Sequence, residues 1–491
     1  MRLTTAARRG ARYQSPDPTS GGGVETTRLE QESAAFRKEL GLTDLVLTQI
    51  VYVVGVIWVG TAAKLGASHG VFWLAAMLLF YLPQAAVVVY LSRRMPYEGG
   101  LYQWTKLGLG ELLGFLVAWN LWLYAVVLIS TVGLVVSTNL SYTFGLASSW
   151  MAGSKAFIVG MNALIIGLIT VLAVIGLKVS KWVHNVGSVM LCAAFAVLIA
   201  LPFVRSARGT IPTYHPLSFA MPAFTLLSLN IFGKMALGAL SGFEYVAVLA
   251  GECKNPERTI GKATLIAAPI IAAMFILGTS SVLAFVPQSE INLISPIPQV
   301  FSRGFTGAGF VSVIVPVTIM LITARTITNT SIVFTGNTRL PMVAGWDRLL
   351  PQWFTRLDPR RRTPVNSIVF VGVVSLLFSV AGIAGVGAQE AFQLLENAAG
   401  IFYGLTYLVL FAIPMVGMRR ATERPPLWLR AASFAGFVVT VLYVVLSIFP
   451  IIDVKSWWSF SLKISGVVVS LNLVGAAIYL AATRRRGVVT A

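Results

Sequence analysis

Runs of about 20 apolar residues recur along this chain, and they constrain its fold more than any other feature. Clear examples are 71–91, 157–177 and 369–388. About 20 apolar residues in a helix cross a bilayer core of roughly 30 Å, and backbone groups in lipid must be paired within the protein. The strict alternation over about 10 residues that a membrane β-barrel needs is not found. We therefore predict an all-α polytopic membrane protein.

The composition supports the same class. Hydrophobic residues make up 56% of the 491 residues and charged residues only 11%, whereas soluble domains carry roughly 25% charged residues. We expect about 12 transmembrane helices, at 42–64, 70–92, 110–139, 156–177, 181–204, 222–252, 261–286, 308–337, 365–386, 391–416, 428–450 and 457–482. The first 36 residues lack the apolar core of a signal peptide. We expect a disordered cytoplasmic tail at 1–40 and a second, short tail at 483–491.

The basic residues indicate the orientation of these helices. The net charge is +19, but most Lys and Arg residues fall in the two tails and in the loops on the same side. Because short basic loops stay in the cytoplasm, and an even number of spans puts both termini on one side, we expect both termini in the cytoplasm and the chain in the inner (cytoplasmic) membrane. This distribution explains the basic character without a nucleic-acid partner.

The sequence argues against an enzyme. Its two cysteines and three histidines are scattered, with no metal-ligand spacing and no phosphate-binding loop. We therefore expect no catalytic residue, no metal and no cofactor. Any transport would have to draw on an ion gradient or on exchange.

Two of the expected spans contain glycines that can interrupt a helix. They lie within 54–60 of the first span and 238–244 of the sixth. Transporters built from inverted repeats bind their substrate between half-helices that are broken at corresponding positions of each repeat. The first and sixth spans correspond if spans one to five and six to ten are the two repeats. Close helix packing is the alternative explanation for these glycines.

The residues after the second glycine segment carry a resemblance to a known family. Residues 241–245 read SGFEY and residues 250–263 read AGECKNPERTIGKA. This run resembles the signature between helices 6 and 7 of the amino acid–polyamine–organocation (APC) superfamily. The motif EGGLY at 98–102 and the arginine and aspartate that precede Pro351 are similar to further landmarks, so the resemblance covers about 40–480.

The resemblance implies a five-plus-five inverted-repeat fold, like that of LeuT, and alternating access. The first repeat would be 41–205, the second 222–416, and two helices at 428–482 would be appended. The implied substrate site lies between helices 1, 3, 6, 8 and 10. The implied function is secondary transport of amino acids, coupled to H+ or Na+ or to a counter-substrate, with the lipid bilayer as surroundings.

Individual site residues follow from the same resemblance. The expected substrate-binding residues are Val54, Gly55 and Val56 at the first break, Ala239, Leu240, Ser241, Gly242 and Phe243 at the second, and Arg325 and Asn329 on helix 8. The expected coupling or gating residues are Glu244, Arg325, Trp119 and Tyr403. Two departures stand out: Leu191 occupies the position of a coupling lysine, and Gly238 the position of a tryptophan that covers the substrate in some antiporters, so the pocket is expected to be roomier or gated differently.

Charged residues inside membrane spans are costly and point to function. Arg325 either serves as a fixed cation or binds an anionic group of the substrate, or it braces the helices by pairing with Glu244 or Glu396. Lys234 is expected in a vestibule. With two cations near essentially one carboxylate, Glu244, we expect neutral or acidic amino acids as substrates; the alternatives are a polyamine or organic amine permease and a non-transporting sensor on the same fold.

Overall fold

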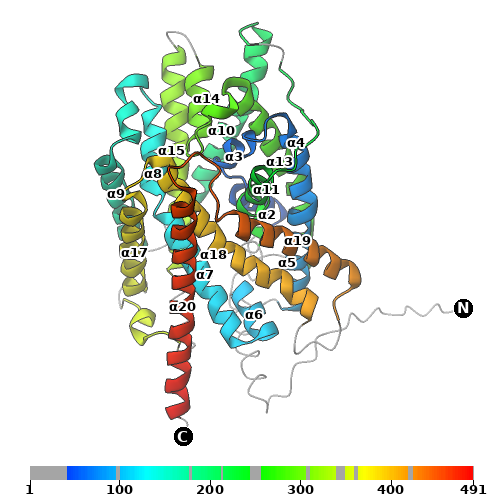
Figure 1. The fold of residues 1–491 in the computed structure, drawn as a ribbon, viewed down its shortest axis with the longest axis vertical. Coiled ribbons are helices and arrows are strands. Elements are labelled where there is room, and N and C mark those ends of the chain that lie inside the picture. Colours follow the sequence, from blue (N-terminus) through cyan, green and yellow to red (C-terminus); the bar gives the residue numbers. More distant parts are fainter. Residues whose placement is uncertain are drawn as a thin grey trace, which may run out of the picture.

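The computed structural model describes residues 41–95, 100–175, 180–211, 214–243, 256–305, 310–338, 349–358, 363–417 and 424–489. Within these ranges the regular structure is helical throughout, without a strand. The long helices form a bundle along the long axis of the molecule (Figure 1). The predicted all-α class is confirmed.

Ten helical stretches of the described chain are long and apolar enough to cross a membrane. Two of them include more than one element: α4 (His69–Ala76), the π-helical η2 (Met77–Tyr81) and α5 (Leu82–Arg94) lie in one, and α7 (Glu111–Ile129) with α8 (Val132–Ser141) forms the next. A third lies in α13 (Pro256–Phe285). The others lie in α9 (Lys155–Ile175), α10 (Ser180–Ala207), α15 (Phe310–Asn337), α17 (Val365–Ile383), α18 (Ala388–Val416), α19 (Leu427–Leu446) and α20 (Trp457–Val489). Their positions match ten of the twelve expected spans, which makes this a multi-pass membrane protein.

The other two expected spans are interrupted, as the glycine segments predict. The first consists of α2 (Leu42–Val53) and α3 (Trp58–Ala63), and the sixth begins with α11 (Leu226–Gly233) and continues as the π-helical η6 (Lys234–Ala239). Residues 244–252, the end of the expected sixth span, lie outside the described residues. The total of twelve spans therefore stays a prediction.

The start of α11 has a local cause in the sequence. Thr225 Oγ1 accepts a hydrogen bond from the Ser228 backbone N–H at 3.1 Å, and Ser228 Oγ accepts one from the Thr225 N–H at 2.8 Å. This reciprocal capping box satisfies two of the N–H groups that a helix start leaves unpaired. It sets the beginning of the segment that leads to the second break.

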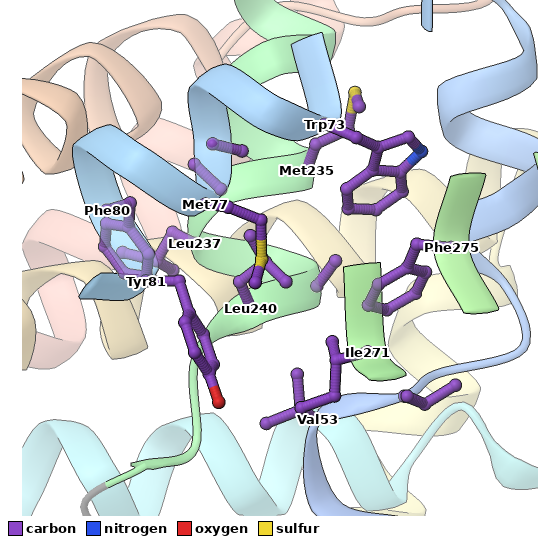
Figure 2. Close-up of a cluster of buried hydrophobic side chains, with 14 of the residues drawn as sticks. Val53, Trp73, Met77, Phe80, Tyr81, Met235, Leu237, Leu240, Ile271 and Phe275 are labelled. Atoms are coloured by element: carbon purple, nitrogen blue, oxygen red, sulfur yellow. The ribbon is translucent and has the colours of Figure 1, made fainter. Parts of the chain in front are cut away.

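The two interrupted helices share a packed core with their neighbours. Figure 2 shows side chains converging from α2, α4, η2, η6 and α13. Trp73 of α4 stacks on Phe275 of α13 with ring centroids 4.3 Å apart, and Trp73 Nε1 donates to Thr279 Oγ1 at 3.1 Å. The hydrophobic effect does not hold helices together in lipid, so their association depends on close packing. Large aromatic side chains such as these supply much of that packing. The half-helices are thus held in place by a well-packed surround.

Short helices occupy two connections that the sequence analysis left as loops. These are α6 (Leu101–Leu109) and α14 (Pro296–Gly304), the latter started by a proline in its first turn, where a missing N–H costs nothing. In Figure 1, α6 lies at the end of the molecule where α20 finishes, and α14 at the opposite end. Single turns complete the described structure: η1 (Gly66–Ser68), η3 (Gly145–Ala147), η4 (Ser149–Ala152), η8 (Gln288–Glu290) and η9 (Gln352–Thr355).

Helices of the first half of the chain pack against helices of the second half. Helix α2 packs against α13, and α10 against α15, so segments of residues 41–205 contact segments of residues 222–416. Spans in corresponding places of the two expected repeats carry the breaks. The inverted repeat itself, with the boundaries stated above, stays a prediction.

Candidate functional site

The break in the first span lies next to a buried arginine. Helix α2 ends at Val53 and α3 begins at Trp58, so the chain leaves the helical path between them. The Val54 carbonyl oxygen accepts a hydrogen bond from Arg325 Nη2 of α15 at 3.3 Å. Arg325 is 8% exposed, and a charged donor is worth more to such a carbonyl than a neutral one. A fixed positive charge therefore lies at the first break.

Two side chains from other helices form hydrogen bonds with the backbone at the break in the sixth span. Gly242 has φ +105°, a backbone conformation that side-chain-bearing residues rarely adopt. Its N–H donates to the Tyr407 hydroxyl of α18 at 2.9 Å, and that hydroxyl donates to Gln84 Oε1 of α5 at 2.9 Å. Gln84 Nε2 in turn donates to the Leu240 carbonyl oxygen. The two backbone groups freed by the break are thus satisfied through one short network.

Sequence reasoning missed Gln84 and Tyr407. Both side chains are completely buried. Gln84 carried a readable signal, because an amide inside an apolar run of the second span must find a hydrogen-bond partner in lipid. Tyr407 carried none, since tyrosines are common at many depths of a membrane protein.

Trp58 lies between the two breaks. A Cβ added at Gly55 would be 2.6 Å from Trp58 Cδ1, and a Cβ added at Gly238 would be 2.4 Å from Trp58 Cη2. One edge of the indole therefore rests on the first break and the opposite edge on η6, just before the second. The space over Gly238 that the sequence left open is occupied by this ring, contributed by α3.

Lys234, which we expected in a vestibule, is buried against α18. Its side chain is 2% exposed, and its Nζ lies 3.9 Å from Glu396 Oε2. Lys234 Nζ also donates to Asn397 Oδ1. Glu396 thus pairs with Lys234. Glu244, the other partner suggested for Arg325, lies outside the described residues. The positive charge of Lys234 is offset locally.

Two expected gating residues lie in different surroundings. Tyr403 stacks on Tyr124 with centroids 4.2 Å apart and meets Tyr407 edge-on at 5.0 Å, so its ring adjoins the network at the second break. Trp119 instead faces α20, where its Nε1 donates to the Leu471 carbonyl oxygen at 2.9 Å. The structure brings Tyr403 to the break network and places Trp119 against the last helix.

The remaining expected binding residues are split between the breaks and the core. Val56 is 7% exposed and Ser241 8% exposed, while Ala239, Leu240 and Phe243 are almost completely buried. Phe243 meets Tyr81 edge-on, with centroids 6.5 Å apart. Asn329 lies one turn beyond Arg325 on α15 and is partly buried. In the part of the chain that the structure describes, no group of three or more His, Cys, Asp or Glu residues is placed to hold a metal.

Known proteins that resemble this chain are membrane transporters. A family model described as amino acid permease matches residues 40–470. A methylthioribose transporter of Bacillus subtilis is 27% identical over 388 residues, which cover 74% of this chain and 78% of that protein. A vacuolar cationic amino acid transporter of Arabidopsis thaliana is 26% identical, over 69% of this chain and 57% of its own length. A branched-chain amino acid permease of Bacillus subtilis is 23% identical, over 74% of this chain and 80% of its own.

Proposed function

Because this chain belongs to the amino acid permease family, whose members are transporters and not enzymes, we propose that it is a secondary active transporter of amino acids. It works by alternating access in the cytoplasmic membrane, with both termini in the cytoplasm. The observation that carries the proposal is the pair of helix breaks, one beside Arg325 and the other held by Gln84 and Tyr407. Backbone polar groups at such breaks are suited to an ammonium and a carboxylate.

The charges near the breaks support a neutral amino acid ahead of an acidic one. The Lys234 ammonium lies 3.9 Å from the Glu396 carboxylate, so this pair adds no net charge. Arg325 donates to the Val54 carbonyl oxygen, and in this position it serves as a fixed cation at the first break. Because Glu396 neutralises Lys234, the substrate does not have to bring an acidic side chain to balance that charge. A zwitterion with an uncharged side chain fits this balance best.

The relatives set the range of substrates to be tested. By their names they carry methylthioribose, cationic amino acids and branched-chain amino acids. A branched-chain substrate agrees with the charge balance proposed here, whereas a cationic one would have to enter a site that contains Arg325. We rank the expected substrates by the charges near the breaks and not by the names of the relatives.

The experiment that tests the proposal is uptake by purified protein in liposomes. Radiolabelled neutral, acidic and cationic amino acids and polyamines are offered in turn, with an imposed pH gradient, a sodium gradient or internal unlabelled substrate. We expect saturable uptake of neutral amino acids. Dependence on a gradient identifies an H+ or Na+ symporter, and dependence on internal substrate identifies an exchanger.

Two outcomes would overturn the proposal in different ways. Uptake of polyamines or cationic amino acids alone would reverse the charge argument and identify an organic amine permease. Binding of an amino acid without uptake under any gradient would favour a sensor. Liposomes without protein serve as the control for leak and for unspecific binding.

A further inference from the structure

The indole of Trp58 is the large side chain that spans the distance between the two breaks. Its Cδ1 and Nε1 atoms lie 2.6 and 2.8 Å from where a Cβ of residue 55 would stand, and its Cη2, Cζ3 and Cζ2 atoms lie 2.4, 2.7 and 2.9 Å from where a Cβ of residue 238 would stand. Real Cβ atoms essentially never come this close to another atom, so a side chain at either position would force the ring or the backbone to shift. The ring keeps this place only because residues 55 and 238 are both glycines.

The Trp58 ring is not completely buried. Trp58, Gly55 and Gly238 are each partly exposed, although the residues around them, Val54, Val59, Leu237 and Ala239, are buried. In a membrane protein, partial exposure at the level of two helix breaks indicates space beside the ring. Part of the indole is therefore accessible to a bound molecule.

The indole N–H provides a second, independent observation. Trp73, Trp104 and Trp119 each use Nε1 as a hydrogen-bond donor. Among the residues that the structure describes, no acceptor is bonded to Nε1 of Trp58 or of the buried Trp122. The Trp58 nitrogen lies next to Gly55 at the first break. An indole N–H is a donor only, and it usually finds a partner when it is buried. A bound molecule with an acceptor at the first break would supply this partner.

We propose that Trp58 is a specificity-determining residue, which forms one wall of the substrate site and limits the size of the substrate's side chain. The inference rests on the proposed function and deepens it: the preferred substrates are amino acids with small, uncharged side chains. The ring edges lie against the backbone of both breaks, where the carboxylate and the ammonium of the substrate are proposed to bind. The broad apolar face of the ring is left for the third substituent, the side chain.

The first test compares substrate profiles. Alanine, serine, valine, leucine and phenylalanine compete for uptake of a labelled small amino acid by the original protein and by Trp58→Ala. Apolar pockets discriminate by about 10–200-fold when a group of methylene size is added or removed. We expect Trp58→Ala to shift the ratio of small to large competitors by at least about 10-fold toward the large ones, and Trp58→Phe to shift it less. An unchanged profile in an active variant overturns the inference.

The second test uses the contact between Trp58 and Gly238. A Cβ in Gly238→Ala collides with the ring, so we expect this variant to lose most of its uptake. In the double variant Trp58→Ala/Gly238→Ala the collision is absent, so uptake should return. Gly167→Ala in α9, where a Cβ meets nothing within 4 Å, is the matched control and should keep its uptake. A double variant that is no better than Gly238→Ala overturns the inference.

Both tests separate this inference from the proposed function. Uptake by the original protein is measured first, and its absence for every amino acid overturns the proposed function together with the substrate named here. Uptake that is present and has the same size preference with and without the ring overturns the inference alone. Thermal unfolding of each purified variant checks that a loss of uptake is not a loss of folded protein, and Trp58→Phe provides the milder substitution if Trp58→Ala is unstable.

Discussion

The ammonium of Lys234 lies 3.9 Å from the carboxylate of Glu396, and both belong to helices that border the second break. Lys234 is in η6, and Glu396 is in α18, the helix that also provides Tyr407 to that break. The Asn397 side chain accepts a further hydrogen bond from Lys234. A buried pair of this kind favours this contact between η6 and α18 over other arrangements, because either charge buried alone would be strongly disfavoured. It joins the π-helical part of the sixth span to α18.

We expect Glu396→Gln to destabilise the protein, because it leaves the Lys234 ammonium buried without a counter-charge. Removing one partner of a buried pair costs about 3–5 kcal/mol. The double variant Lys234→Met/Glu396→Gln, which removes both charges, should recover most of that loss. Thermal or denaturant unfolding in detergent measures the difference. Single and double variants whose effects simply add would contradict the pairing.

We expect Tyr407→Phe to weaken the second break. The change removes the acceptor of the Gly242 N–H and the donor to Gln84 Oε1, both at 2.9 Å. An unsatisfied buried polar group costs about 1–3 kcal/mol, so both the unfolding midpoint and the uptake rate should fall. Tyr90→Phe is the matched control, since its partly buried ring lies beneath the Arg94 guanidinium and keeps that contact. Equal effects of the two substitutions would argue against the network.

We expect Arg325→Ala to reduce uptake by at least about 10-fold, corresponding to about 1.4 kcal/mol. The Val54 carbonyl oxygen at the first break would lose its charged donor, and Arg325→Lys should keep part of the activity because it keeps the charge. Arg303→Ala is the control: its 2.6 Å pair with Glu290 is largely exposed, and exposed pairs contribute about 0–1 kcal/mol. Undiminished uptake by Arg325→Ala would rule out a functional role for this arginine.

We expect Gly242→Ala to destabilise the protein through its backbone alone. The position has φ +105°, and a Cβ there would meet nothing within 4 Å, so steric contact contributes nothing. Holding a residue with a side chain in such a conformation costs about 1–3 kcal/mol. Gly466→Ala in α20, which is helical and equally unobstructed, should instead be neutral or slightly stabilising, since alanine is the better helix former. The two unfolding midpoints should therefore move in opposite directions, or only the first should move.

Much of the fold was readable from the sequence. The apolar runs predicted ten spans that the structure describes, and the glycine segments at 54–60 and 238–244 predicted two interruptions that are observed. These features are local: the length of an apolar run and the conformational freedom of glycine do not depend on what packs nearby. The short helices α6 and α14 were not predicted, because nine-residue segments of mixed polarity between spans give no clear periodic signal.

The candidate site was readable only in part. The sequence placed Arg325 and both breaks near one another through a family resemblance, and the structure joins Arg325 to Val54 across 271 positions of the chain. It did not indicate that Gln84 and Tyr407, which are 323 positions apart, share the second break. Nor did it indicate that Trp58 takes the space over Gly238.

The sequence by itself determined that this chain is a membrane bundle, where its helices run and where two of them break, because hydrophobic length and backbone freedom are properties of neighbouring residues. Only the tertiary structure decided which buried groups meet: Lys234 with Glu396, Gly242 with Tyr407, and the Trp58 ring with Gly55 and Gly238. The reason is physical. The energy of a buried charge, an unpaired N–H or a ring between two glycines depends on distances of a few ångströms between segments far apart in the chain.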